Sequence, residues 1–307
     1  MKKTVLILVI LILTGMELGA VEYRSSGLAF LRVKPDARTT AMGGAGTALR
    51  PDGGSFTPSL FILNPAIRVD SLHTTAQIGH SFWLAGSGIE FLGIAFPGGA
   101  GQWGLFITSA NMDDFELRED RATDDPLGYF GAHYLHGGVS GNYRVNSSLA
   151  VGVRASVLYE KIYHHQAAGG SFTAGAQYKI TRGLTAGLTL NHLGAMSELR
   201  EESTPLPSSV RGGLSYDIKL MQQQLKLLLL ADGGYYFQDQ LFGAGGLELT
   251  MWDQISARFG ISGSDGDLRT SFGGGFRWKR LRVDYGLWLD DAGLGTPHQI
   301  SVSLGLN

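Results

Sequence analysis

The sequence contains no cysteine, which excludes a disulfide framework, a thiol nucleophile, a cysteine-ligated metal site and a lipidated N-terminus. It also has no excess of either charge. The 25 basic residues are balanced by 27 acidic ones, which argues against a nucleic-acid-binding protein, because such proteins carry a clear basic excess. Only nine prolines are present, although glycine is abundant at 45 of 307 residues. Neither collagen nor a proline-rich disordered chain is therefore expected.

Long hydrophobic runs are also missing after the first twenty residues. Two lysines follow the initiator, Val5–Leu13 is uninterrupted and apolar, and the small pair Gly19-Ala20 follows. This order is typical of a secretory signal, and the apolar run is shorter than the roughly 20 residues that span a bilayer. We predict a signal peptide at residues 1–20 and a mature protein beginning near Val21. An N-terminal membrane anchor is the alternative.

The longest later apolar run is Leu227–Ala231, which is too short to cross a membrane as a helix. A membrane protein of this sequence is therefore expected to be a closed β-barrel, the only other fold that pairs every backbone polar group within lipid.

From about residue 70 the chain alternates apolar and polar residues with period two. In 281–290, for example, Leu, Val, Tyr, Leu and Leu alternate with Arg, Asp, Gly, Trp and Asp. Alternation over about ten residues is typical of a transmembrane β-strand. We count fourteen such segments, give or take two. They are 72–84, 87–96, 102–110, 129–143, 148–161, 168–180, 183–192, 206–218, 223–234, 240–251, 255–262, 267–278, 281–290 and 298–306.

The connections between these segments alternate in length. Short ones such as 181–182 and 279–280 alternate with longer ones such as 111–128 and 193–205. Short periplasmic turns and longer outer loops are typical of outer-membrane barrels, whereas a soluble β-sandwich has no reason to sort its loops in this way. We predict an all-β fold, a transmembrane antiparallel β-barrel of about 14 strands over residues 71–307, in the bacterial outer membrane.

In such a barrel one face of each strand meets lipid and the other lines the lumen. The apolar set is assigned to lipid, with aromatic residues near the strand ends at the two membrane interfaces. Charges of both signs then face the lumen, where they can neutralise one another; the alternative is a substrate path. The predicted lumen-facing charges are Arg211, Asp217, Glu248, Arg269, Arg277, Arg282 and Asp284, together with Arg154, Glu160, Lys219, Lys226, Arg258 and Asp290.

Residues 21–70 do not alternate well. They contain the small-residue stretch Ala37–Leu49, which is a candidate helix start. The lumen is the available space for some fifty residues that precede a barrel. We predict that this segment forms a plug or hatch there, with Arg38 paired to a lumen acid such as Glu248 or Asp284. A flexible periplasmic tail is the alternative.

An ordered set of short motifs lies within the same segment: Arg38, Met42, Gly43 and Gly44, then Asn64, Pro65 and Ala66. This set resembles the N-terminal signature of the PorV/PorQ family of outer-membrane proteins, which are similar to the FadL long-chain fatty-acid transporters. The resemblance covers about residues 28–68, and the final residue, Asn307, departs from the terminal aromatic residue common in outer-membrane proteins. It implies a fourteen-stranded barrel with the motif residues forming a plug inside.

The resemblance also implies a non-enzymatic function. PorV/PorQ proteins belong to the type IX secretion system, where they help to hand cargo to the cell surface. The expected partners are then outer-membrane lipid, secreted cargo proteins and other secretion components. The alternative is a FadL-like passive transporter of hydrophobic small molecules across the outer membrane, with residues 21–70 as the hatch. An enzyme barrel is a third hypothesis, but no catalytic set can be defined.

Other motifs give no defined site. Gly99–Gly104 matches GxGxxG but enters a strand, so it lacks the helix N-terminus that binds pyrophosphate and is interpreted as a turn. His133 and His136 are three apart on a strand and face opposite sides. The acid-rich loop 113–125 is interpreted as solvated, with calcium binding as the alternative. We expect no catalytic, cofactor or metal site.

Overall fold

The computed structural model describes residues 27–51, 57–68, 73–99, 101–118, 124–221, 224–238, 240–264, 267–289 and 295–306. The predicted signal peptide and Asp290 lie outside the described residues. The strands are β1 (Thr75–Phe82), β2 (Gly88–Gly98), β3 (Gly101–Leu117), β4 (Gly128–Arg144), β5 (Leu149–Ile162), β6 (His165–Lys179), β7 (Leu184–Met196), β8 (Ser209–Leu220), β9 (Leu225–Tyr236), β10 (Gln240–Met251), β11 (Ile255–Ser264), β12 (Asp267–Trp278), β13 (Leu281–Leu289) and β14 (His298–Gly305). The short helices are η1 (Ala29–Arg32), α2 (Ala37–Thr40), α3 (Leu60–Leu63) and η3 (Leu84–Gly86).

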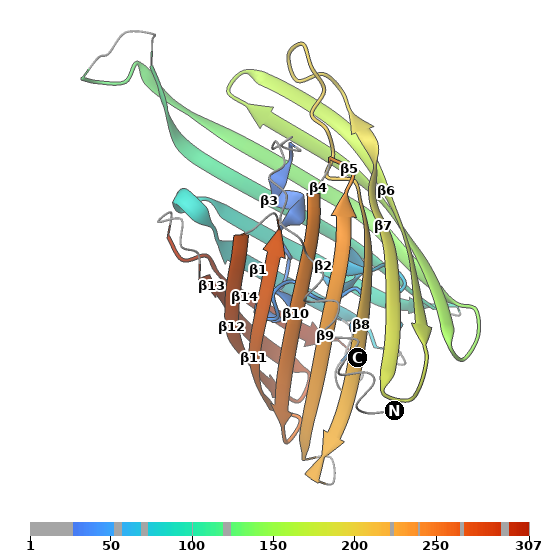
Figure 1. Ribbon diagram of the computed structural model, residues 1–307. Coiled ribbons are helices and arrows are strands. Elements are labelled where there is room, and N and C mark those ends of the chain that lie inside the picture. Colours follow the sequence, from blue (N-terminus) through green and yellow to red (C-terminus); the bar gives the residue numbers. More distant parts are fainter. Residues whose placement is uncertain are drawn as a thin grey trace.

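The described strands close into one antiparallel barrel (Figure 1). Each strand pairs with its neighbours in sequence, and β1 pairs with β14 over the whole of both strands. No strand edge is therefore left open, which satisfies the backbone as lipid requires. The prediction of a transmembrane antiparallel barrel of about 14 strands is confirmed. Among the described residues, no helix is long and apolar enough to cross a membrane.

The period-two pattern sorts the side chains between the two faces of the wall. On β13, Arg282 and Asp284 are buried inside, whereas Tyr285 and Leu289 are exposed on the outer surface. On β12, Ser271 is fully buried and Phe272 is exposed outside. The apolar residues of the alternation therefore face outward, as expected for a barrel that presents them to lipid.

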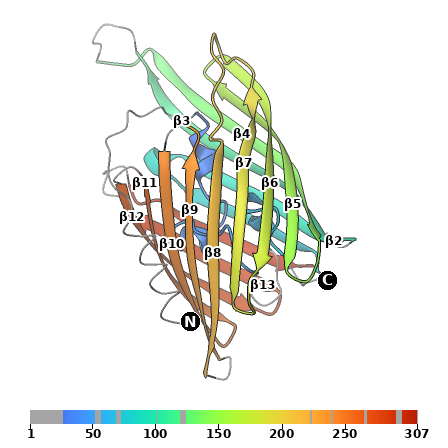
Figure 2. The same ribbon diagram turned by 45° about the vertical axis from the view of Figure 1, so that its right-hand side comes forward.

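One predicted loop is wrong. The sequence places a connection at 111–128, but β3 runs on to Leu117 and β4 begins at Gly128, so this hairpin stands well clear of the rim in Figures 1 and 2. A register shift between Met112 and Phe115 bends the extension. The extension carries acidic residues and no regular apolar alternation, and the two strands are joined there by backbone pairing and by the stacked rings of Phe115 and Phe130, 5.4 Å apart. Apolar alternation therefore could not reveal it.

The N-terminal segment, defined as residues 27–51 and 57–68, lies inside the barrel (Figure 2). Helix α2 packs against β12, β13 and β14. Asp36 caps it by accepting a hydrogen bond from the Thr39 N–H at 3.0 Å, a normal N-cap interaction.

An apolar cluster forms where this segment meets the wall. Its segment residues include Met42 and Phe61, and its wall residues include Ala95, Leu228 and Leu230. Strands β2 and β9 are apolar on both faces because their inner faces contact this cluster and their outer faces point outward. The mixed pattern at 89–96 and 225–230, ambiguous in the sequence, follows from that packing.

Candidate functional site: the barrel interior

Glycines on the inner wall let the N-terminal segment approach the strands closely. A Cβ at Gly260 would lie 2.1 Å from the Gly43 nitrogen, and one at Gly246 would lie 2.6 Å from the Met42 Cβ. Gly246 and Gly260 are cross-strand partners on β10 and β11. Gly43 and Gly44 have φ angles of +68° and +75°, a region that L-residues with side chains rarely adopt. The Met42-Gly43-Gly44 motif therefore turns where the barrel wall presents glycines, which have no side chain to block the contact.

A buried charge cluster joins Arg38 to three strands. Of the two acids expected as partners of Arg38, the structure pairs it with Glu248 on β10, through contacts of 2.9 and 2.6 Å. The Arg258 Nε on β11 donates to Glu248 Oε2 at 2.5 Å, and its Nη2 lies 2.8 Å from Asp284 Oδ1 on β13. Arg282 Nε donates to Asp284 Oδ2 at 2.7 Å. Three arginines share two carboxylates, so the cluster keeps one positive charge.

Asp232 on β9 is a second anchor that the sequence reasoning missed. Its Oδ2 accepts hydrogen bonds from the backbone N–H groups of Gly46 and Thr47 at 2.8 and 2.9 Å, and from Arg211 Nε at 3.0 Å. Arg211 also donates to the Gly44 carbonyl oxygen. The signal in the sequence was a single acid directly after the apolar run Leu227–Ala231.

The Asn64-Pro65-Ala66 motif ties the two halves of the segment together. The Asn64 Nδ2 donates to the Thr47 carbonyl oxygen at 2.8 Å and to that of Ala176 on β6 at 3.3 Å. Its Oδ1 accepts from the Ala66 N–H at 2.9 Å. Asn64 is fully buried, and every one of these bonds satisfies a polar group that burial would otherwise penalise.

The remaining predicted charges lie at different depths, from part-exposed to fully buried. Asp217 forms a part-exposed ion pair with Arg50 at 3.2 Å. The Arg277 backbone N–H donates to the Gln254 carbonyl oxygen at 2.7 Å, near the turn that precedes β11. Arg154 is fully buried and donates to the carbonyl oxygens of Phe61 and Ile62 at 3.1 and 2.9 Å.

Two cavities lie on opposite sides of the N-terminal segment. We call the barrel end with the β3–β4 and β7–β8 connections the upper end, and the other the lower end. The lower cavity, about 480 Å³, is lined by charged residues that include Arg38, Arg50, Lys219, Lys226 and Glu248. The upper cavity, about 420 Å³, is lined by η1 and by the upper ends of several strands.

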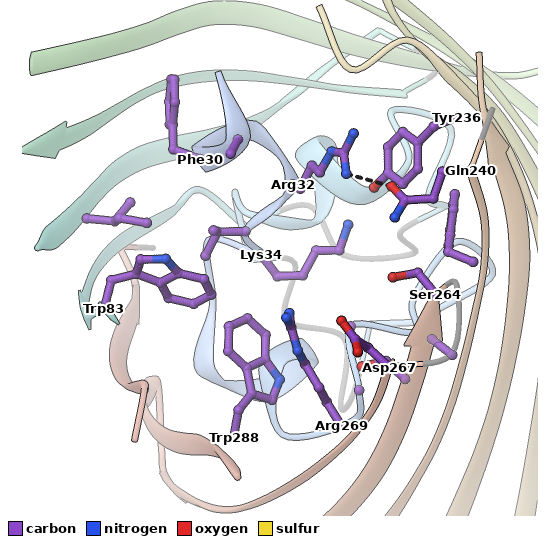
Figure 3. A pocket seen from close by; sticks show the side chains of 18 of the residues that line it. Phe30, Arg32, Lys34, Trp83, Tyr236, Gln240, Ser264, Asp267, Arg269 and Trp288 are labelled. Atoms are coloured by element: carbon purple, nitrogen blue, oxygen red, sulfur yellow. Dashed lines mark hydrogen bonds between the residues drawn. The ribbon is translucent and has the colours of Figure 1, made fainter. Parts of the chain in front are cut away.

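Several aromatic side chains line the upper cavity (Figure 3). The rings of Trp83 and Trp288 meet edge to face with centroids 4.8 Å apart, and those of Phe30 and Tyr134 are 5.4 Å apart. Aromatic walls of this kind favour apolar and aromatic guests. Sequence reasoning named neither tryptophan as a site residue. The signal for Trp288 was its position on the polar, inward face of the alternation in 281–290.

Cationic side chains share the same cavity. The Arg32 guanidinium donates to Gln240 Oε1 at 2.7 Å and stacks 4.1 Å above the Tyr236 ring. The Lys34 stem runs past Gly44, where an added Cβ would lie 3.4 Å from the Lys34 Cε. Burial, and then repulsion from Arg211, lower the pKa of the Lys34 amine well below its ordinary value.

The comparisons with known proteins identify the fold. No protein-family model and no curated protein sequence matches the chain. Similar solved structures include the Pseudomonas putida toluene transporter TodX, with a TM-score of 0.63 and 12% identity over 87% of this chain and 96% of that one. The CymD monoaromatic hydrocarbon channel gives 0.61 and 12% over 92% and 99%. A Pseudomonas aeruginosa FadL homologue gives 0.59 and 11% over 89% and 98%.

These likenesses establish a barrel fold shared with FadL-like channels and, at such low identity, nothing finer. None of these structures supports the PorV/PorQ assignment or a function in type IX secretion. They do agree with the expected similarity of the barrel to FadL-like proteins. These similar structures are channels and transporters, not enzymes.

Proposed function

We propose that this protein is a passive channel that carries hydrophobic small molecules across the bacterial outer membrane. The observation that carries the proposal is the aromatic upper cavity, which lies inside a closed barrel beneath its longer connections. An apolar solute gains free energy by leaving water for such a cavity, at roughly 25 cal/mol per Å² of apolar surface buried. The toluene and monoaromatic hydrocarbon channels of the same fold support this proposal over protein export.

The N-terminal segment is, in this proposal, the plug between the two cavities. Phe30, Lys34 and Gly43 line the upper cavity, whereas Arg38 and Arg50 line the lower one. A solute that crosses the barrel axially passes this segment. Its hydrogen bonds to Glu248 and Asp232 hold it in place between transport events.

The test compares two tryptophan substitutions on β11. Ser262 lines the upper cavity, and Ser262→Trp should fill it. Ala257 lies on the opposite, outward face of the same strand, where Ala257→Trp should be tolerated in lipid. Uptake of radiolabelled toluene is measured in a bacterial host that lacks its own hydrocarbon channels.

Expression of the native protein should raise the uptake rate, Ser262→Trp should abolish most of that gain, and Ala257→Trp should retain it. A folded native barrel in the outer membrane with no gain in uptake would overturn the proposal.

A further inference from the structure

The upper cavity has an unbalanced charge. Its lining contains four cationic side chains, Arg32, Lys34, Arg211 and Arg269, and one acid, Asp267. Arg211 is neutralised by its buried ion pair with Asp232 at 2.9 Å. The cavity therefore keeps a surplus of positive charge at the upper mouth of the barrel, where Lys34 is half-buried and Arg269 is exposed.

Two of these cations have no partner within the described part of the chain. Lys34 and Arg269 form no hydrogen bond or ion pair through their side chains there, whereas buried arginines of the barrel interior such as Arg38, Arg211 and Arg258 do. The Trp288 indole Nε1 is buried in the same cavity and also has no acceptor. Three donors thus line one cavity without an acceptor, and one of them, the Trp288 Nε1, is buried, where donors are nearly always satisfied.

The apolar and cationic groups occupy different parts of the cavity. In Figure 3 the Lys34 side chain extends through the middle, with Trp83 and Trp288 on one side and Tyr236 and Gln240 on the other. Arg269 rises from β12 beside Trp288. A ligand seated against the two tryptophans would place a group attached to its ring between Lys34 and Arg269.

We propose that the upper cavity binds an aromatic carboxylate of one or two rings. The ring packs on Trp83 and Trp288, and the carboxylate accepts hydrogen bonds from the Lys34 ammonium and the Arg269 guanidinium. This inference rests on the proposed channel function and names aromatic acids as the solutes that the upper cavity binds most tightly, while neutral aromatic molecules such as toluene still pass. A neutral hydrocarbon would cover both cations and leave them without a counterion, whereas a carboxylate supplies the missing acceptors.

The position of Lys34 supports the same ligand. Its pKa is lowered by burial and by nearby arginines, and a bound carboxylate would offset both effects and raise it. The cavity volume, about 420 Å³, also falls in the range of ordinary small-molecule sites.

Binding to the purified full-length barrel in detergent tests the proposal by equilibrium dialysis. The matched probes are naphthalene-2-carboxylate and naphthalene-2-carboxamide, which share a shape and differ in charge, and dodecanoate serves as a non-aromatic acid. The variants are Lys34→Gln and Arg269→Gln. Arg118→Gln is the control, because Arg118 is paired with Glu116 on the β3–β4 hairpin away from the cavity.

The native protein should bind the carboxylate about tenfold more tightly than the carboxamide, as expected for a charge-assisted hydrogen bond. Each of the two cavity variants should weaken carboxylate binding about tenfold and leave carboxamide binding nearly unchanged, and Arg118→Gln should alter neither. Equal losses for both naphthalene probes, or a carboxamide that binds as well as the acid, would overturn the anion site and leave the channel proposal standing. Tighter binding of dodecanoate than of naphthalene-2-carboxylate would overturn the aromatic class. The channel proposal is tested separately by the toluene-uptake experiment, and an absence of uptake there would overturn it.

Discussion

The Pro65 carbonyl oxygen lies 2.2 Å from the point that a Cβ at Gly152 would occupy. Gly152 is on β5, and this contact brings the Asn64-Pro65-Ala66 motif directly onto the barrel wall. We predict that Gly152→Ala displaces the motif and destabilises the protein by about 1–3 kcal/mol, because a well-packed site cannot absorb the added methyl group. Limited proteolysis of the N-terminal segment and thermal loss of the SDS-resistant barrel measure the effect.

The matched control is Gly137→Ala on β4. A Cβ there would meet only the Phe106 carbonyl oxygen, at an ordinary distance of 3.6 Å. Equal sensitivity of the two variants would show that the motif does not need its close contact with β5.

The buried cluster around Glu248 predicts an order of severity. Glu248→Gln would leave Arg38, Arg258 and Arg282 with Asp284 as their single carboxylate, and a buried charge left unpaired costs about 3–5 kcal/mol. Arg38→Met would instead leave two arginines and two carboxylates in balance. Glu248→Gln should therefore destabilise the barrel more than Arg38→Met in urea unfolding followed by tryptophan fluorescence. The reverse order would contradict this charge balance.

The face assignment predicts different outcomes for arginine on the two sides of the wall. Phe272 is exposed on the outer face near the middle of β12, and Phe272→Arg should cost about 2–4 kcal/mol in lipid. Ser264→Arg would project into the upper cavity beside the acid Asp267, its cross-strand partner, and should assemble almost normally. Ser271 would be a poor inward control, because it is fully buried and accepts a hydrogen bond from the Gly43 N–H at 2.9 Å. Heat-modifiable mobility in SDS measures assembly of the barrel. Equal losses of assembly in the outward and inward variants would show that the assigned strand register is wrong by one residue.

Deletion of residues 28–60 tests whether the N-terminal segment obstructs the lumen. The segment lies between the upper and lower cavities, so its removal should join them and raise single-channel conductance in planar bilayers severalfold. The native protein provides the reference, and heat modifiability shows that the shortened barrel is folded. Unchanged conductance of a folded, shortened barrel would mean that the segment does not close the pore.

The sequence by itself determined the barrel. A β-strand places successive side chains on opposite faces, so the pattern within each strand shows which residues face outward, and connections of alternating length separate the described strands. The same local rule failed at the β3–β4 hairpin, where acidic residues interrupt the apolar alternation although the two strands stay paired.

Only the tertiary structure decided the contents of the lumen. Arg38 and Glu248 are 210 residues apart, and Trp83 and Trp288 belong to opposite ends of the barrel sequence. Closure of β1 on β14 brings Trp83 beside Trp288, and placement of the N-terminal segment inside the barrel selects Glu248 over Asp284 as the direct partner of Arg38 and uses Asp232 as an anchor. Alternation reports which face a side chain occupies, but the partner it meets across the lumen depends on strand register and barrel closure, which are long-range properties.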